Sequence, residues 1–87
     1  MITGKTSTGF EFVLEEDVLD DYELLENLKK ADDGDGSCLI EVVDQLLGEK
    51  QKNRLKDHVR TEKGRVSAKR LLEEISEIFQ SCNAGKN

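Results

Sequence analysis

The sequence predicts a mainly α fold, namely a small four-helix domain with a short N-terminal β-hairpin. Three observations predict it: apolar residues alternate along the chain near its start, they recur at helical spacing as far as residue 82, and Pro is absent. Without Pro, long helices lack the residue that breaks them most strongly. The 87 residues are enough for one domain, so we predict a single domain over 1–87.

Residues 1–14 are predicted to form the hairpin. Phe10, Phe12 and Leu14 alternate with Glu11 and Val13, which is the period of a strand with one buried face. Glycines earlier in the segment supply a turn. Because a lone hairpin is only marginally stable in water, we expect its phenyl face to pack against the helices.

Four helices are predicted within residues 17–82, and loop chemistry separates them. Their approximate ranges are 17–31, 38–47, 49–63 and 67–82. The DDGDG run at 32–36 favours a loop, and Gly48 and Gly64 have the position of glycines that follow helix C-termini. Residues 83–87 are expected to be a frayed tail.

The apolar residues of each predicted helix occupy an arc around the helix axis, which we call its apolar stripe, and the stripes differ in width. The stripe covers about 120° on the last helix, about 220° on the first and about 160° on the second, where one buried face needs roughly 100° or a little more. The extra residues on the first two helices are Leu19, Leu24, Ile40 and Leu47. Two interpretations stay open: these four side chains belong to an ordinary core, or they stay partly exposed as a partner-binding surface. Our prediction for a binding site is the second.

Charge is unevenly distributed along the chain. The net charge is −6, with −10 in residues 1–50 and +4 in residues 51–87. This separation favours contact between copies, acidic half against basic half, so self-association is predicted. The acidic half repels phosphate, which makes nucleic acid an unfavourable partner.

No catalytic, metal-binding or cofactor-binding residue is predicted, and we expect a protein that is not an enzyme. His58 is the only His, and it lacks zinc-site spacing to Cys38 and Cys82. The loop at 32–36 lacks the ligand positions of an EF-hand. Because we find neither a secretory signal nor an apolar run that spans a membrane, we expect free thiols, a cytoplasmic location and no membrane partner.

A basic stretch over residues 50–70 supports a different function. Nine Lys and Arg residues lie in this passage, which spans the end of one predicted helix, a turn and the start of the next. A DNA reader places such a helix in the major groove. A small DNA-binding regulator is therefore the alternative function, although the last helix turns acidic after this stretch and stacking aromatic residues are missing.

Several segments resemble the small tail assembly chaperones of long-tailed phages and prophages of Gram-positive bacteria. They are ITGKTSTGFEF (2–12), LDDYELLE (19–26), LLGEKQK (46–52), LKDHVR (55–60), GRV (64–66) and EEISEIF (73–79). The likeness covers nearly the whole chain and departs from the family pattern at residues 31–38. The resemblance rests on the order and content of these short segments, and it includes no catalytic motif.

The resemblance implies a specific protein partner. Chaperones of this family bind the tape measure protein, a long helix-rich chain that sets tail length, and keep it soluble until tail-tube subunits polymerise around it. They act in the cytoplasm of the host and are usually absent from the finished virion. The resemblance therefore implies a non-catalytic tail assembly chaperone.

Overall fold

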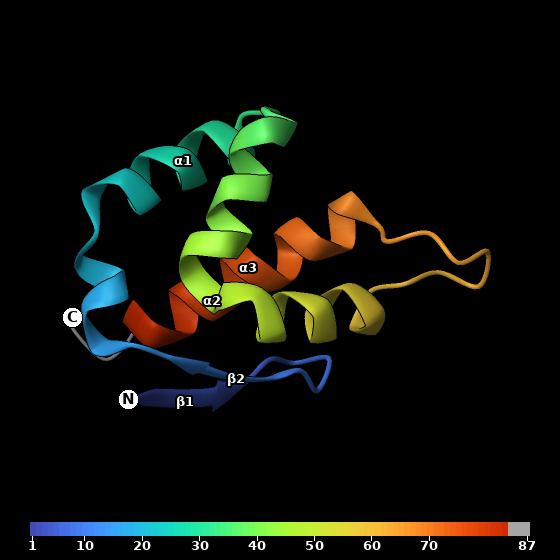
Figure 1. Cartoon of the computed structure of the whole chain (residues 1–87), viewed down its shortest axis with the longest axis horizontal. Helices are drawn as coiled ribbons and strands as arrows, with labels where there is room; N and C mark the ends of the chain where they lie inside the picture. The colour runs from blue at the N-terminus through green and yellow to red at the C-terminus, as the bar shows by residue number, and fades with distance from the viewer. Residues whose placement is uncertain (84–87) are drawn as a thin grey trace.

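The computed structural model describes residues 1–83 and contains three helices and one β-hairpin (Figure 1). Its elements are β1 (Ile2–Lys5), β2 (Glu11–Leu14), a 3₁₀ helix η1 (Glu16–Asp20), α1 (Tyr22–Asp32), α2 (Gly36–His58) and α3 (Ala68–Asn83). The predicted mainly α fold with an N-terminal hairpin is confirmed, but the predicted count of four helices is wrong. The predicted frayed tail, 83–87, lies outside the described residues except for Asn83, which ends α3.

The hairpin is antiparallel and buries one face, as the alternation predicts. Its register runs from Ile2 opposite Leu14 to Lys5 opposite Glu11. Phe10, Phe12 and Leu14 are buried, whereas Glu11 and Val13 are exposed. The free edge of β2 is covered by side chains of α2, because Gln51 hydrogen-bonds both backbone groups of Val13 and Arg54 donates to the carbonyl of Glu11.

The predicted first helix does not begin at residues 17–20. Residues 16–20 form the short η1 turn, and Asp21 adopts an extended conformation that separates η1 from α1. The Asp21 carboxylate accepts hydrogen bonds from the amides of Glu23 and Leu24 at 2.9 and 3.3 Å, which is the geometry of an N-cap. Leu19 therefore belongs to η1 and not to α1.

The predicted second and third helices are one kinked helix, α2. Gly48 lies within it at φ 75° and ψ 173°, a conformation that a residue without a Cβ adopts at low cost. The chain turns there and resumes helical structure without an intervening loop, so the glycine bends the helix where we predicted an end. The helix then stops at His58, before the predicted end at Lys63, and Arg60 pairs with Val66 in an isolated bridge across the following turn.

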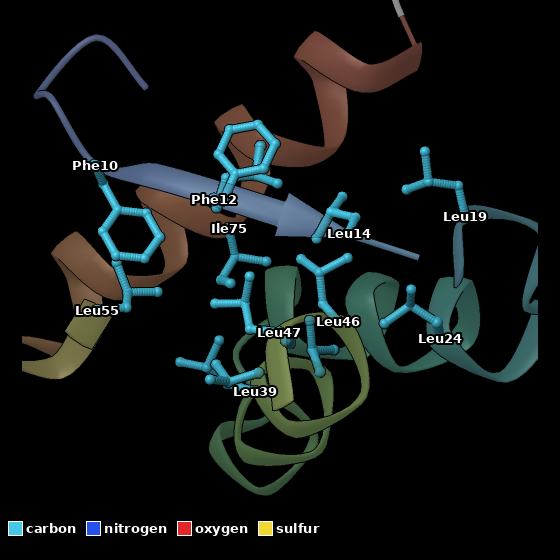
Figure 2. Close-up of a cluster of buried hydrophobic side chains, with 14 of the residues drawn as sticks. Phe10, Phe12, Leu14, Leu19, Leu24, Leu39, Leu46, Leu47, Leu55 and Ile75 are labelled. Carbon is cyan, nitrogen blue, oxygen red and sulfur yellow. The ribbon is translucent and has the colours of Figure 1, made fainter. Parts of the chain in front are cut away.

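One hydrophobic core joins all the elements (Figure 2). The largest fully buried side chains come from β2, α1, both halves of α2, and α3; they are Leu14, Leu24, Val42, Leu55, Ile75 and Ile78. α1 packs along the first half of α2, and the second half of α2 supports the hairpin. Among the helices of residues 1–83, none is both long and apolar enough to cross a membrane.

Candidate functional site: an apolar groove between α1 and α3

Three of the four predicted binding residues are core residues. Leu24, Leu47 and Leu19 are 0, 6 and 9% exposed, whereas Ile40 is 66% exposed. The expectation of exposed flanks is therefore wrong for the three leucines. Leu19 lies on η1, so the angle that a continuous helix would give it does not apply. Within α1 the buried residues, Leu24 and Ala31, share one face, whereas Leu25 on the side of that face is exposed. Ile40 alone fits the prediction of an exposed apolar flank.

The apolar groove on the surface lies between α1 and α3. It has a volume of about 310 Å³ and is lined by Leu25, Leu28, Lys29, Asp32, Ser76, Phe79 and Gln80. Leu25 is 41% exposed, and Leu28 and Phe79 are half-buried. Three large apolar side chains from two helices thus remain accessible within one concave surface, with polar and charged residues at its sides.

Packing fixes the orientation of both walls of the groove. Ile75 and Ile78 of α3 are completely buried and hold that helix against the core, so Phe79 and Ser76 must lie on its flank. On α1, the buried Leu24 likewise holds the helix against the core, so Leu25 lies at the edge of the groove. Phe79 belongs to the narrow apolar stripe of the last predicted helix, yet the core covers this ring only in part.

The opposite flank of α3 carries a buried polar cluster. The Glu74 carboxylate, 5% exposed, accepts hydrogen bonds from the hydroxyls of Thr6 at 2.8 Å and Thr8 at 2.9 Å. The His58 Nε2 atom lies 2.9 Å from the Thr8 hydroxyl. One turn along α3, Glu77 accepts from the amide and hydroxyl of Ser7, the latter at 2.8 Å. These bonds fasten the tip of the hairpin to α3 and α2.

The side chains of Thr8, His58 and Glu74 do not have the geometry of a catalytic triad. In a triad the ring nitrogen accepts the proton of the hydroxyl, and the carboxylate binds the other ring nitrogen. Here the Thr8 hydroxyl donates to Glu74, and the nearest approach of Glu74 to the ring, 3.9 Å, is to the same Nε2 atom. The exposed His58 ring lies against Thr8 and Phe10.

Three residues of the basic stretch, Arg60, Lys63 and Arg65, lie on the loop between α2 and α3, which projects from the rest of the molecule (Figure 1). A shallow depression of about 650 Å³ there is lined by Arg60, Lys63, Arg65 and Arg70 together with polar neighbours. Arg54 does not join them, because its guanidinium lies 5.1 Å from the centre of the Phe10 ring and donates to the hairpin. Only part of the basic stretch is therefore free to meet a ligand.

Neither thiol belongs to a metal cluster within the described part of the chain. Residues 1–83 contain no group of three or more His, Cys, Asp or Glu side chains that is close enough to hold a metal ion. Cys38 and Cys82 are free and pack against the core, as expected for small apolar groups. Burial raises the pKa of both thiols, which keeps them protonated and poorly nucleophilic.

Within residues 1–83, the groove and the projecting basic loop are two surfaces with the chemistry to bind another molecule. The groove offers apolar side chains with polar edges, and the loop offers positive charge. Comparison of the chain with protein-family models, with curated proteins and with solved structures finds no match.

Proposed function

We propose that this protein is a non-catalytic tail assembly chaperone that binds the tape measure protein and keeps it soluble until the tail tube polymerises around it. The observation that carries the proposal is the apolar α1–α3 groove, with Leu25, Leu28 and Phe79 accessible in it. The resemblance of the sequence to this chaperone family supplies the identity of the partner. The protein then acts in the cytoplasm of the host and is absent from the finished virion.

The groove suits an amphipathic helix as its occupant. A helix binds in a groove through apolar residues at positions i, i+3 or i+4, and i+7, which fill apolar pockets while polar residues face outward. Leu25 and Leu28 on one wall and Phe79 on the other provide such pockets, and Lys29, Asp32 and Gln80 provide polar edges. A helix-rich tape measure protein exposes segments of this kind before the tail tube covers it.

Co-expression with the tape measure protein tests the proposal. The soluble fraction of the tape measure protein should rise when this chain is present and should not rise with Leu25→Asp, because a carboxylate in the groove disfavours an apolar partner. Ile40→Asp is the matched control, since it puts the same charge on an exposed apolar position outside the groove. Loss of solubilisation with Ile40→Asp but not with Leu25→Asp would place the partner elsewhere, and no effect of the wild-type chain would reject the function.

DNA binding remains the second candidate function, and the projecting basic loop favours it. Lys63 and Arg65 are exposed there beside Arg60 and Arg70. A DNA-binding protein loses affinity steeply between about 50 and 200 mM salt, because phosphate contacts release counterions. Fluorescence anisotropy with a labelled DNA duplex over this range separates the two functions: a DNA-binding protein binds tightly at the lower salt concentration and loses affinity steeply toward the higher one, whereas the chaperone proposal expects no tight binding at either concentration.

A further inference from the structure

The exposed side of α1 extends the wall of the α1–α3 groove toward the start of that helix. Tyr22 lies three residues before Leu25 and is 72% exposed, so its ring lies about one turn beyond the first apolar side chain that lines the groove. Glu26, four residues after Tyr22, is also exposed. Because residues three and four apart are neighbours on a helix surface, Tyr22 and Glu26 lie side by side at this end of the groove.

This end of the groove wall is acidic, whereas the other end is balanced in charge. Residues 15–26 contain seven Asp and Glu residues and no Lys or Arg. Residues 29–33, at the end of α1, contain two Lys and two Asp, and Lys29 pairs with Asp33 at 3.1 Å. The two ends of the groove therefore differ in the charge that they present to an occupant.

The opposite wall does not neutralise the acidic end. α3 ends on the side of the molecule where α1 begins (Figure 1). The residues of α3 that line the groove, Ser76, Phe79 and Gln80, are uncharged, and residues 71–83 contain no Lys or Arg. Within the described part of α3, no cation beyond residue 70 therefore faces the start of α1.

The side chains of Tyr22 and Glu26 have no polar partner within residues 1–83. The carboxylate of Glu26 forms no ion pair there, unlike Glu16, which pairs with the amino group of Met1 at 3.0 Å. Asp21 has a structural role as the N-cap of α1, but no hydrogen bond occupies the Tyr22 hydroxyl in this part of the chain. An aromatic face and a carboxylate thus lie together, accessible, at the end of an apolar groove.

We propose that the occupant of the groove is an amphipathic helix with a basic side chain, Arg or Lys, about one turn beyond its apolar residues, and that Tyr22 and Glu26 bind this basic side chain. The inference rests on the proposed function, because it names the class of helix that the same groove selects. It makes Tyr22 and Glu26 residues that determine specificity, whereas Leu25, Leu28 and Phe79 supply the apolar contact.

A basic side chain suits this position for two physical reasons. A guanidinium or ammonium group is attracted both to the face of an aromatic ring and to a carboxylate, and Tyr22 and Glu26 provide both. An acidic segment at the same place would meet like charges from residues 15–26, which disfavours binding. The groove therefore binds apolar faces in general, and its acidic end discriminates between helices by charge.

Three synthetic helical peptides that differ only in their flanking residues provide the probe. Each carries Leu at positions i, i+3 and i+7. The residues one turn before the first Leu and one turn after the last are both Arg, both Gln or both Glu, so that one of them reaches Tyr22 whichever way the helix runs. Fluorescence anisotropy at about 10 mM salt, where charges are screened over about 30 Å, gives the dissociation constants.

The Arg peptide should bind the wild-type chain about two- to fivefold more tightly than the Gln peptide, and the Glu peptide should bind more weakly than both. The double variant Tyr22→Ala with Glu26→Gln should lose this order while its affinity for the Gln peptide stays the same. Tyr22→Phe should keep it, because the phenyl ring retains the aromatic face. Glu41→Gln is the matched control for charge, since it removes one exposed carboxylate outside the groove.

The outcomes separate this inference from the proposed function. Leu25→Ala should weaken all three peptides alike, because it removes apolar contact only. Equal affinities of the three peptides for the wild-type chain, or a preference for Arg that survives in the double variant, would overturn the inference alone. The same holds if the double variant weakens all three peptides equally, since Tyr22 would then be one more apolar wall. No binding of any peptide would reject the groove as a site for a helix, and the inference with it.

Discussion

The two flanks of α3 differ in how the rest of the chain contacts them. On one flank, Glu74 and Glu77 accept hydrogen bonds from the hydroxyls and an amide of the hairpin tip, so both carboxylates are paired within the protein. On the other flank, Phe79 faces a groove that α1 does not close. The same helix thus has one flank that is sealed by polar contacts and one that is left open and apolar.

Because of this difference, we expect one flank of α3 to contribute to the stability of the fold and the other flank to contribute to partner binding. A buried carboxylate needs its hydrogen bonds, because leaving either side unpaired costs free energy. A half-buried phenyl or leucine side chain has no such requirement and gains free energy when a partner covers it. We therefore expect substitutions on the sealed flank to lower the free energy of unfolding and substitutions on the open flank to affect association.

The largest effect is expected for Glu74→Ala. The substitution removes the acceptor of the Thr6 and Thr8 hydroxyls, so the free energy of unfolding should fall by about 2–3 kcal/mol. Glu73→Ala is the matched control, because Glu73 is the exposed neighbour on the same helix. Chemical denaturation measures both, and equal stability of the two variants would show that the polar cluster does not hold the sealed flank together.

A slightly smaller effect is expected for Gly48→Ala. The kink at Gly48 directs the second half of α2 toward the hairpin, where Gln51 and Arg54 cover the edge of β2. A Cβ at this positive φ is strained by about 1–3 kcal/mol, although no atom lies close enough to clash with it. Gly36→Ala is the control, because that glycine lies in α2 without a positive φ. A loss of stability in the control as large as that in Gly48→Ala would refute this role of the kink.

The smallest effect on stability is expected for Leu25→Asp on the open flank. Because Leu25 is 41% exposed, the free energy of unfolding should change by no more than about 1 kcal/mol. Thermal unfolding followed by circular dichroism measures this change. A cooperative transition near that of the wild type would separate a loss of binding from a loss of folding, whereas an unfolded variant would show that the groove wall belongs to the core.

Local patterns in the sequence predict the elements better than their connections. The alternation of Phe10, Phe12 and Leu14 predicts the buried face of the hairpin correctly, since strand geometry alone fixes that face. The extended Asp21, which separates η1 from α1, leaves no comparable signal. Gly48 gives the right position for a change of direction but does not reveal whether the helix ends or bends there.

The binding site could be predicted only in part. The stripe width correctly left Ile40 outside the core, but it also predicted exposure for Leu19, Leu24 and Leu47, because it does not show how many neighbours a helix has. The groove joins Leu25 to Phe79, residues that are far apart in sequence, and no local pattern connects them. The surplus width of the first stripe was the one signal that pointed to α1.

The most direct test of the central claim is an NMR titration of the purified chain with a helical segment of the tape measure protein. Signals of the Leu25 and Leu28 methyl groups and of the Ser76 and Gln80 amides should shift together, since these residues line the α1–α3 groove. The methyl groups of Ile40, which is exposed outside the groove, should not move. Shifts confined to Ile40, or to Lys63 and Arg65 in the basic loop, would contradict the claim that the open flank of α3 is where the partner binds.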